Sequence, residues 1–181
     1  DARIGTEIGR YKRLPLVSGT GAYLLSTGVN FIRGIHEHYV VDVDGQHFDG
    51  NQTLLCIANG RYYGGSFNPV PDAEPDDGLL DVVLLKPVPR LKLPGLLGGY
   101  KKGEHLTPDG TVTEKFRPYL AYFRTSAIDI RVLDPKPMIT TLDGECSPQK
   151  TLHAETARRS ARILLPPKLA YNAPVLQVMG E

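Results

Sequence analysis

Two short stretches of this chain place carboxylates directly beside a glycine, where they could bind a cation or accept a proton. The first, "DAEPDDG" at residues 72–78, sets four carboxylates in front of the glycine: Asp72, Glu74, Asp76 and Asp77. Magnesium and calcium prefer oxygen ligands, and a tight turn can add backbone carbonyls to a carboxylate. The alternative is an ordinary β-turn, in which Asp76 and Asp77 hydrogen-bond to their own backbone.

The second stretch is "TLDGECSP" at residues 141–148, where an Asp-Gly pair follows an apolar strand-like run. A turn of this kind can present Glu145 at the end of a sheet, where its carboxylate could accept the proton of a hydroxyl nucleophile. A simple hairpin turn with no chemical role is the alternative.

A third stretch, "ANGRYYGGSFNP" at residues 58–69, is rich in glycine and lies between the first strands and the acidic loop. Glycines permit a ligand to approach the backbone closely. The stretch is neither a Walker A loop nor a dinucleotide fingerprint. It could equally be a plain hairpin loop.

The amino-acid composition limits the classes of protein to which this chain can belong. The chain has 181 residues and a net charge of +1, which gives no general attraction to nucleic acid. Its 19 glycines and 15 prolines indicate many short elements joined by turns. No apolar run reaches the roughly 18 residues of a membrane span. Two distant cysteines, Cys56 and Cys146, favour a reducing compartment.

The hydrophobic pattern predicts a mainly β protein, an antiparallel β-sandwich lobe with about seven to nine strands and two or three helices. Helices are expected at 14–36 and 90–105, the second with an apolar stripe of Leu93, Leu96, Leu97 and Tyr100. Asp44-Gly45 predicts a hairpin turn. Strands are expected at 39–43, 52–59, 78–86 (buried on both faces), 127–133, 138–142, 161–167 and 174–179, and a loop at 149–160.

Taken in order, these motifs resemble those of a known enzyme family. The chain reads Asn-Gly-x-Tyr-Tyr-Gly-Gly, then Asp-Asp-Gly-Leu-Leu-Asp-Val, then a helical stretch ending in Gly-x-His, then Asp-Gly-Glu. This series, from about residue 55 to 145, resembles the C-terminal part of the diacylglycerol kinase-like lipid kinases, which include bacterial diacylglycerol kinases and sphingosine and ceramide kinases.

The resemblance implies a two-lobed enzyme, of which residues 1–181 form the C-terminal β-sandwich lobe. In the family, ATP binds to an N-terminal lobe that carries Gly-Gly-Asp-Gly-Thr. That motif is absent from this chain, which begins without Met, so we expect it to be a piece of a longer protein and inactive alone.

The resemblance also assigns residues. Glu145 matches the catalytic carboxylate, which acts as general base toward the lipid hydroxyl. Asp77 matches a side-chain ligand of a structural Mg²⁺, and the backbone carbonyls of Glu74 and Leu79 match its other protein ligands. Residues 64–66 are Gly-Gly-Ser, where relatives commonly have three glycines.

The function expected is that of an ATP-dependent lipid kinase that phosphorylates diacylglycerol or a related lipid in phospholipid metabolism. The expected partners are ATP and a lipid at a membrane surface, with no nucleic acid and with a homodimer left open. A cytoplasmic protein with peripheral membrane association follows, and basic residues beside Leu91, Leu93, Leu96 and Leu97 mark a candidate membrane-facing edge, with core packing as the alternative. The rival functions are a sphingoid-type lipid kinase and a non-catalytic β-sandwich module that binds lipid or protein.

Overall fold

The computed structural model describes residues 37–63, 67–157 and 160. The expected helix at 14–36, the expected strands at 161–167 and 174–179, and the Gly-Gly-Ser of 64–66 lie outside the described residues. The described ranges contain one helix, α3 (Leu93–Lys102), and nine strands: β1 (Glu37–Val43), β2 (Gln46–Gln52), β3 (Leu54–Ala58), β4 (Leu80–Leu85), β5 (Leu120–Thr125), β6 (Ala127–Val132), β7 (Met138–Leu142), β8 (Glu145–Gln149) and β9 (Thr151–Glu155).

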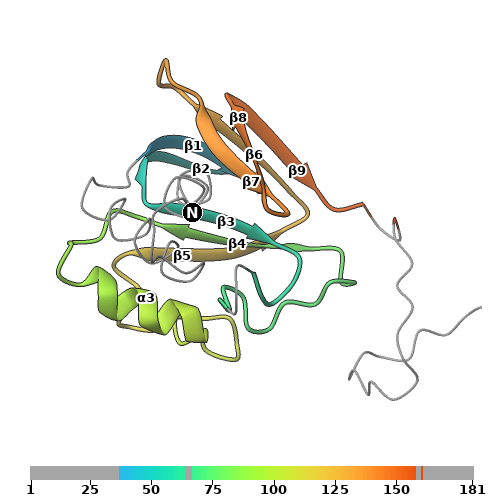
Figure 1. Cartoon of the computed structure of the whole chain (residues 1–181). Helices are drawn as coiled ribbons and strands as arrows, with labels where there is room; N and C mark the ends of the chain where they lie inside the picture. Colours follow the sequence, from blue (N-terminus) through green and yellow to red (C-terminus); the bar gives the residue numbers. More distant parts are fainter. Residues whose placement is uncertain (1–36, 64–66, 158–159, 161–181) are drawn as a thin grey trace, which may run out of the picture.

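The strands form three antiparallel sheets. Four strands pair in the order β2-β1-β6-β9, three in the order β3-β4-β5, and β7 pairs with β8 alone. Helix α3 lies on the side of the β3-β4-β5 sheet that faces away from the four-stranded sheet (Figure 1). The mainly β, sandwich-like architecture predicted from the sequence is therefore confirmed.

The two larger sheets pack face to face through an apolar core. Val41 and Val43 of β1 and Ile128 and Ile130 of β6 meet Val82 and Leu84 of β4, and Met138 of β7 joins them. Every one of these seven side chains is at most 4% exposed. Phe48 of β2 also stacks on Phe123 of β5, with ring centroids 5.6 Å apart.

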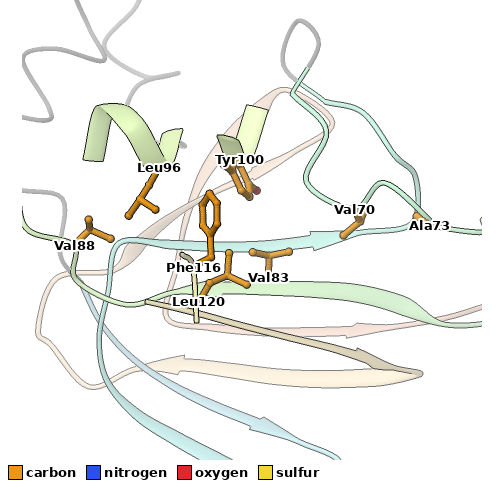
Figure 2. Close-up of a cluster of buried hydrophobic side chains, with 8 residues drawn as sticks. All are labelled: Val70, Ala73, Val83, Val88, Leu96, Tyr100, Phe116 and Leu120. Carbon is orange, nitrogen blue, oxygen red and sulfur yellow. The ribbon is translucent and has the colours of Figure 1, made fainter. Parts of the chain in front are cut away.

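A second core lies between the other face of the β3-β4-β5 sheet and helix α3. Val83 points into it, opposite in direction to Val82 and Leu84, because successive side chains of a strand alternate between faces. Figure 2 shows Leu96 and Tyr100 of α3 gathered with Phe116, Leu120, Val70, Ala73 and Val88 around Val83. Strand β4 is thus buried on both faces, as its run of apolar residues, interrupted only by Asp81, predicts.

Two tight turns confirm the Asp-Gly predictions. Asp44 and Gly45 have φ of 45° and 75° between β1 and β2, and Asp143 and Gly144 have φ of 48° and 94° between β7 and β8. Positive φ at both central positions is the geometry of a type I′ turn, which matches the twist of a hairpin.

The prediction of a loop over 149–160 is wrong. Residues Thr151–Glu155 form β9, which pairs with β6. Leu152 and Ala154 pack against the core between the sheets, so a polar segment with only two apolar residues suffices to complete the sheet. Strand β5, which none of the expected strands covers, likewise forms because β4 offers it a partner along six residue pairs.

Candidate functional site

The acidic loop folds as a tight turn. The Asp77 amide donates to the Glu74 carbonyl at 3.3 Å, and the Leu79 amide donates to Asp77 Oδ1 at 2.8 Å. Gly78 takes φ of 80°, a conformation that residues with a Cβ adopt only at a cost. Asp77 is half-buried and its carboxylate faces its own turn, whereas Glu74 and Asp76 are exposed.

Neighbouring segments hold this loop in place. Asn59 Nδ2 donates to the Pro75 carbonyl and Arg61 Nε to the Ala73 carbonyl, both at 3.3 Å. Thr156, just after β9, donates its hydroxyl to the Gly78 carbonyl at 3.0 Å. The Asn-Gly loop, the acidic loop and the end of β9 therefore meet at the start of β4.

Arg124 of β5 joins the acidic loop to the sheet. Its Nη2 pairs with Asp77 Oδ2, and its Nε lies 3.5 Å from Asp81 Oδ1. Arg124 stands directly opposite Asp81 in the β4–β5 register, so both side chains share one face of the sheet. One guanidinium thus spans two carboxylates that lie four residues apart.

Asp81 is a buried acid, with only 1% of its surface exposed. Burial raises its pKa, and the nearby charge of Asp72 adds to this, although the Tyr122 hydroxyl donates to Asp81 Oδ1 at 2.5 Å and favours the charged form. Burial also raises the pKa of Tyr122, helped by its hydrogen bond to Asp81. Asp81 and Tyr122 thus form a hydrogen-bonded pair, which Arg124 connects to Asp77 of the acidic loop.

The free energy of unfolding should fall as the pH rises from about 4 toward neutrality, and we expect this fall to be smaller in Asp81→Asn than in the wild type. The raised pKa means that the folded chain holds a proton above pH 3.8, where the unfolded chain has begun to release it. The free energy of unfolding therefore falls as pH rises from about 4 through the folded pKa. Urea unfolding at several pH values measures the slope, with exposed Asp76→Asn as the matched control. Equal slopes for Asp81→Asn and wild type would contradict the assignment.

The acidic turn has donors that suit a hard cation. It offers the Asp77 carboxylate and, through the link between Asp77 and Glu74, a backbone carbonyl in the same turn. Arg124 is the existing positive partner of that carboxylate and would share it with a metal. Among the described residues, no three His, Cys, Asp or Glu side chains converge as a metal site. The acidic turn would differ from such a site, because it would bind a cation with one carboxylate and backbone carbonyls.

Glu145 is the first residue of β8 and stands at the tip of the β7–β8 hairpin, opposite Leu142. Its side chain is exposed, and Leu142 is 77% exposed. Its carboxylate forms no hydrogen bond or ion pair with the described residues. The hairpin thus presents a free carboxylate beside an uncovered apolar side chain.

The structure brings together some of the predicted site and not all of it. Hydrogen bonds link the acidic loop with the Asn-Gly loop, whereas none of those described reaches from either loop to Glu145. Sequence reasoning missed Arg124, Asp81 and Tyr122. Asp81 carried a signal, because it is the one acid within an apolar run expected to be buried on both faces.

Comparison with known sequences identifies relatives of this chain. The model of the family described as "YegS C-terminal NAD kinase beta sandwich-like domain" matches residues 1–165. "Probable lipid kinase YegS-like" of Alcanivorax borkumensis is 29% identical over 168 residues, which cover 90% of this chain and 52% of that protein. The protein of the same name in Pseudomonas syringae is 33% identical over 126 residues, covering 69% and 40%. The chain spans about half the length of the first curated relatives it matches.

Comparison with solved structures supports the same fold. A crystal structure described as that of a candidate diacylglycerol kinase from Bacillus anthracis str. Sterne superposes with a TM-score of 0.50 at 19% sequence identity. The match covers 76% of this chain and 45% of the other. At this identity the likeness speaks for the fold alone.

Proposed function

The chain belongs to the family of YegS C-terminal NAD kinase beta sandwich-like domains, and from this premise we propose that it is the C-terminal lobe of an ATP-dependent lipid kinase. The observation that carries the proposal is the family match over residues 1–165, together with relatives that are named lipid kinases. The nucleotide-binding lobe, with most contacts to ATP, would lie outside this chain. The chain alone would then be inactive.

In the proposed reaction the lipid hydroxyl attacks the γ-phosphorus of ATP. Glu145 accepts the hydroxyl proton as the new oxygen–phosphorus bond forms, and the bond between the γ-phosphorus and the bridging oxygen breaks to release ADP. The exposed, unpaired carboxylate at a hairpin tip supports this role, because a base must reach a substrate held between two lobes.

The lipid itself is proposed as diacylglycerol, on the resemblance of the motif series; a sphingoid base is the rival substrate. The test is phosphate transfer from labelled ATP by the full-length protein to diacylglycerol and to sphingosine in mixed micelles. We expect diacylglycerol to be the best substrate. Transfer to sphingosine alone would favour the rival, and no transfer to any lipid would favour a non-catalytic binding module.

The acidic turn is proposed as a structural Mg²⁺ site, with Asp77 and the carbonyls of Glu74 and Leu79 as ligands. The oxygen donors of the turn support this, and Arg124, which already pairs with Asp77, would share that carboxylate with the cation. A bound cation would add a second positive charge beside the two carboxylates, Asp77 and Asp81, that Arg124 now spans alone.

We expect Mg²⁺ to raise the melting temperature of the protein and Asp77→Ala to abolish that rise, since binding to the folded state alone stabilises it. Thermal unfolding with and without millimolar Mg²⁺ measures the effect. Asp76→Ala, an exposed carboxylate of the same loop, is the matched control and should keep the full response. A Mg²⁺ response in Asp77→Ala equal to that of wild type would remove Asp77 from the site.

We also propose a cytoplasmic protein that associates peripherally with membranes. Neither Cys56 nor Cys146 forms a disulfide, which fits a reducing compartment. No helix among the described residues is long and apolar enough to cross a bilayer. A kinase of membrane lipids must nevertheless work at a bilayer surface.

A further inference from the structure

One surface of the described structure combines positive charge with exposed leucine. It comprises the turn before helix α3 and the outer side of that helix, and we call it the α3 face. Residues 86–103 contain no Asp or Glu and five Lys or Arg: Lys86, Arg90, Lys92, Lys101 and Lys102. Helix α3 lies outside the β3-β4-β5 sheet, on the far side from the four-stranded sheet (Figure 1).

The segment that carries this face is strongly basic. Residues 86–117 hold seven Lys or Arg against three Asp or Glu, a net charge of +4. The whole chain carries only +1, so the remaining residues sum to −3. An overall balance near zero therefore conceals basic segments of the chain, and this one, which lies within the described residues, is complementary to an anionic surface.

The leucines of this segment divide between the core and solvent. Leu96 is 4% exposed and packs on Phe116 and Val83, as a core residue should. Leu91 is 99% exposed, and Leu97 is 38% exposed on the outer side of the helix. A leucine that is entirely in water contributes nothing to the fold, which leaves its apolar side chain available to a partner.

Two glycines extend the outer side of the helix. Gly95 and Gly98 are both exposed, and a Cβ built on either would meet no atom within 4 Å. Packing within the described structure therefore does not require glycine at these positions, although glycine weakens a helix relative to alanine. The Gly95 carbonyl, between Leu91 and Leu97 in the chain, accepts a hydrogen bond from Lys115 Nζ at 3.2 Å, which places a further cation beside the face.

Three cations at the edge of the face can still pair with an anionic partner. Arg90 forms no ion pair with the described residues, and Lys101 lies over the Phe67 ring at 5.6 Å rather than beside an acid. Lys102 is 3.7 Å from Glu104, an exposed pair that contributes little and can exchange partners. An anionic headgroup would meet these three cations without displacing a buried salt bridge.

We propose that the α3 face docks on the surface of an anionic phospholipid bilayer, with Leu91 and Leu97 entering the headgroup region and Arg90, Lys101 and Lys102 contacting lipid phosphates. This inference rests on the proposed lipid kinase function, which requires the protein to reach a bilayer. Interfacial binding draws on both buried apolar area and attraction to anionic lipid, and the face supplies both.

The test is sedimentation of the full-length protein with vesicles of phosphatidylcholine alone or with phosphatidylglycerol at about a third of the lipid. We expect binding to the anionic vesicles only, and a fall of about tenfold in Leu91→Glu and in Leu97→Glu. Leu133→Glu, at a residue that is 62% exposed outside this face, is the matched control and should bind as wild type does. Salt at 0.5 M should weaken binding of the wild type.

Several outcomes would overturn the proposal. They are equal binding to neutral and anionic vesicles, and undiminished binding of Leu91→Glu and Leu97→Glu. A third is an oligomer that dissociates in these variants while vesicle binding persists, because the face would then belong to a second copy of the chain. The assay needs no ATP, so it separates this proposal from catalysis: phosphorylation of a dispersed short-chain lipid by Leu91→Glu would leave the kinase function standing whatever the vesicles show.

Discussion

Glu145→Gln should lower the kcat of the full-length protein by about 10²- to 10⁴-fold, the range by which a general base accelerates proton transfer. Glutamine keeps the size and polarity of the side chain but cannot accept the hydroxyl proton. The KM for ATP should change little, because the nucleotide would bind to the other lobe. Steady-state transfer of labelled phosphate to diacylglycerol micelles measures both parameters.

The structure indicates that Glu145→Gln should not disturb the fold. Glu145 is exposed and its carboxylate forms no hydrogen bond or ion pair with the described residues, so the free energy of unfolding should stay within about 0.5 kcal/mol of wild type. Exposed Glu114→Gln is the matched control for the loss of one charge. Near-normal turnover by Glu145→Gln would remove Glu145 from the catalytic role.

The largest effect on stability is expected from Phe116→Ala, at about 3–5 kcal/mol of unfolding free energy. Phe116 is 1% exposed and sits between helix α3 and strand β4 (Figure 2). A Cβ built on Gly99 would lie 3.0 Å from its ring, so helix and ring are in close contact. Truncation would leave a cavity that a helix and a sheet cannot readily close.

Urea unfolding measures the loss, and Leu91→Ala is its control within the same segment. Leu91 is 99% exposed, so its truncation should change the unfolding free energy by less than about 0.5 kcal/mol. A loss below about 1 kcal/mol in Phe116→Ala would mean that the ring is not the support of helix α3. The same two variants therefore separate the core side of this segment from its outer side.

Much of the local structure could be predicted from the sequence. The Asp-Gly turns at 44–45 and 143–144 and the doubly buried β4 follow from neighbouring residues alone, because turn conformation and side-chain alternation are properties of a few consecutive positions. The motif order also indicated the family that the comparison then identified. The position of Glu145 at a hairpin tip likewise follows from its neighbours in the sequence, because it comes directly after the Asp143-Gly144 turn.

The candidate site depends on contacts that no short stretch specifies. Arg124 reaches Asp77 from 47 residues away, and it does so only because β5 pairs with β4 in the register that sets Arg124 opposite Asp81. Strand β9 forms where the sequence predicted a loop, because β6 offers an open edge. Pairing of this kind is decided by the whole sheet and not by the propensity of the segment.

The leucines near helix α3 show the same difference between what the sequence determines and what the tertiary structure determines. From the sequence, Leu91, Leu93, Leu96 and Leu97 could all have served a core or a membrane edge. By itself the sequence determined that an amphipathic helix would form there and which turns would flank the sheets. Only the tertiary structure decided that Leu96 is buried while Leu91 is in water, because burial depends on where the helix meets Phe116 and the β3-β4-β5 sheet.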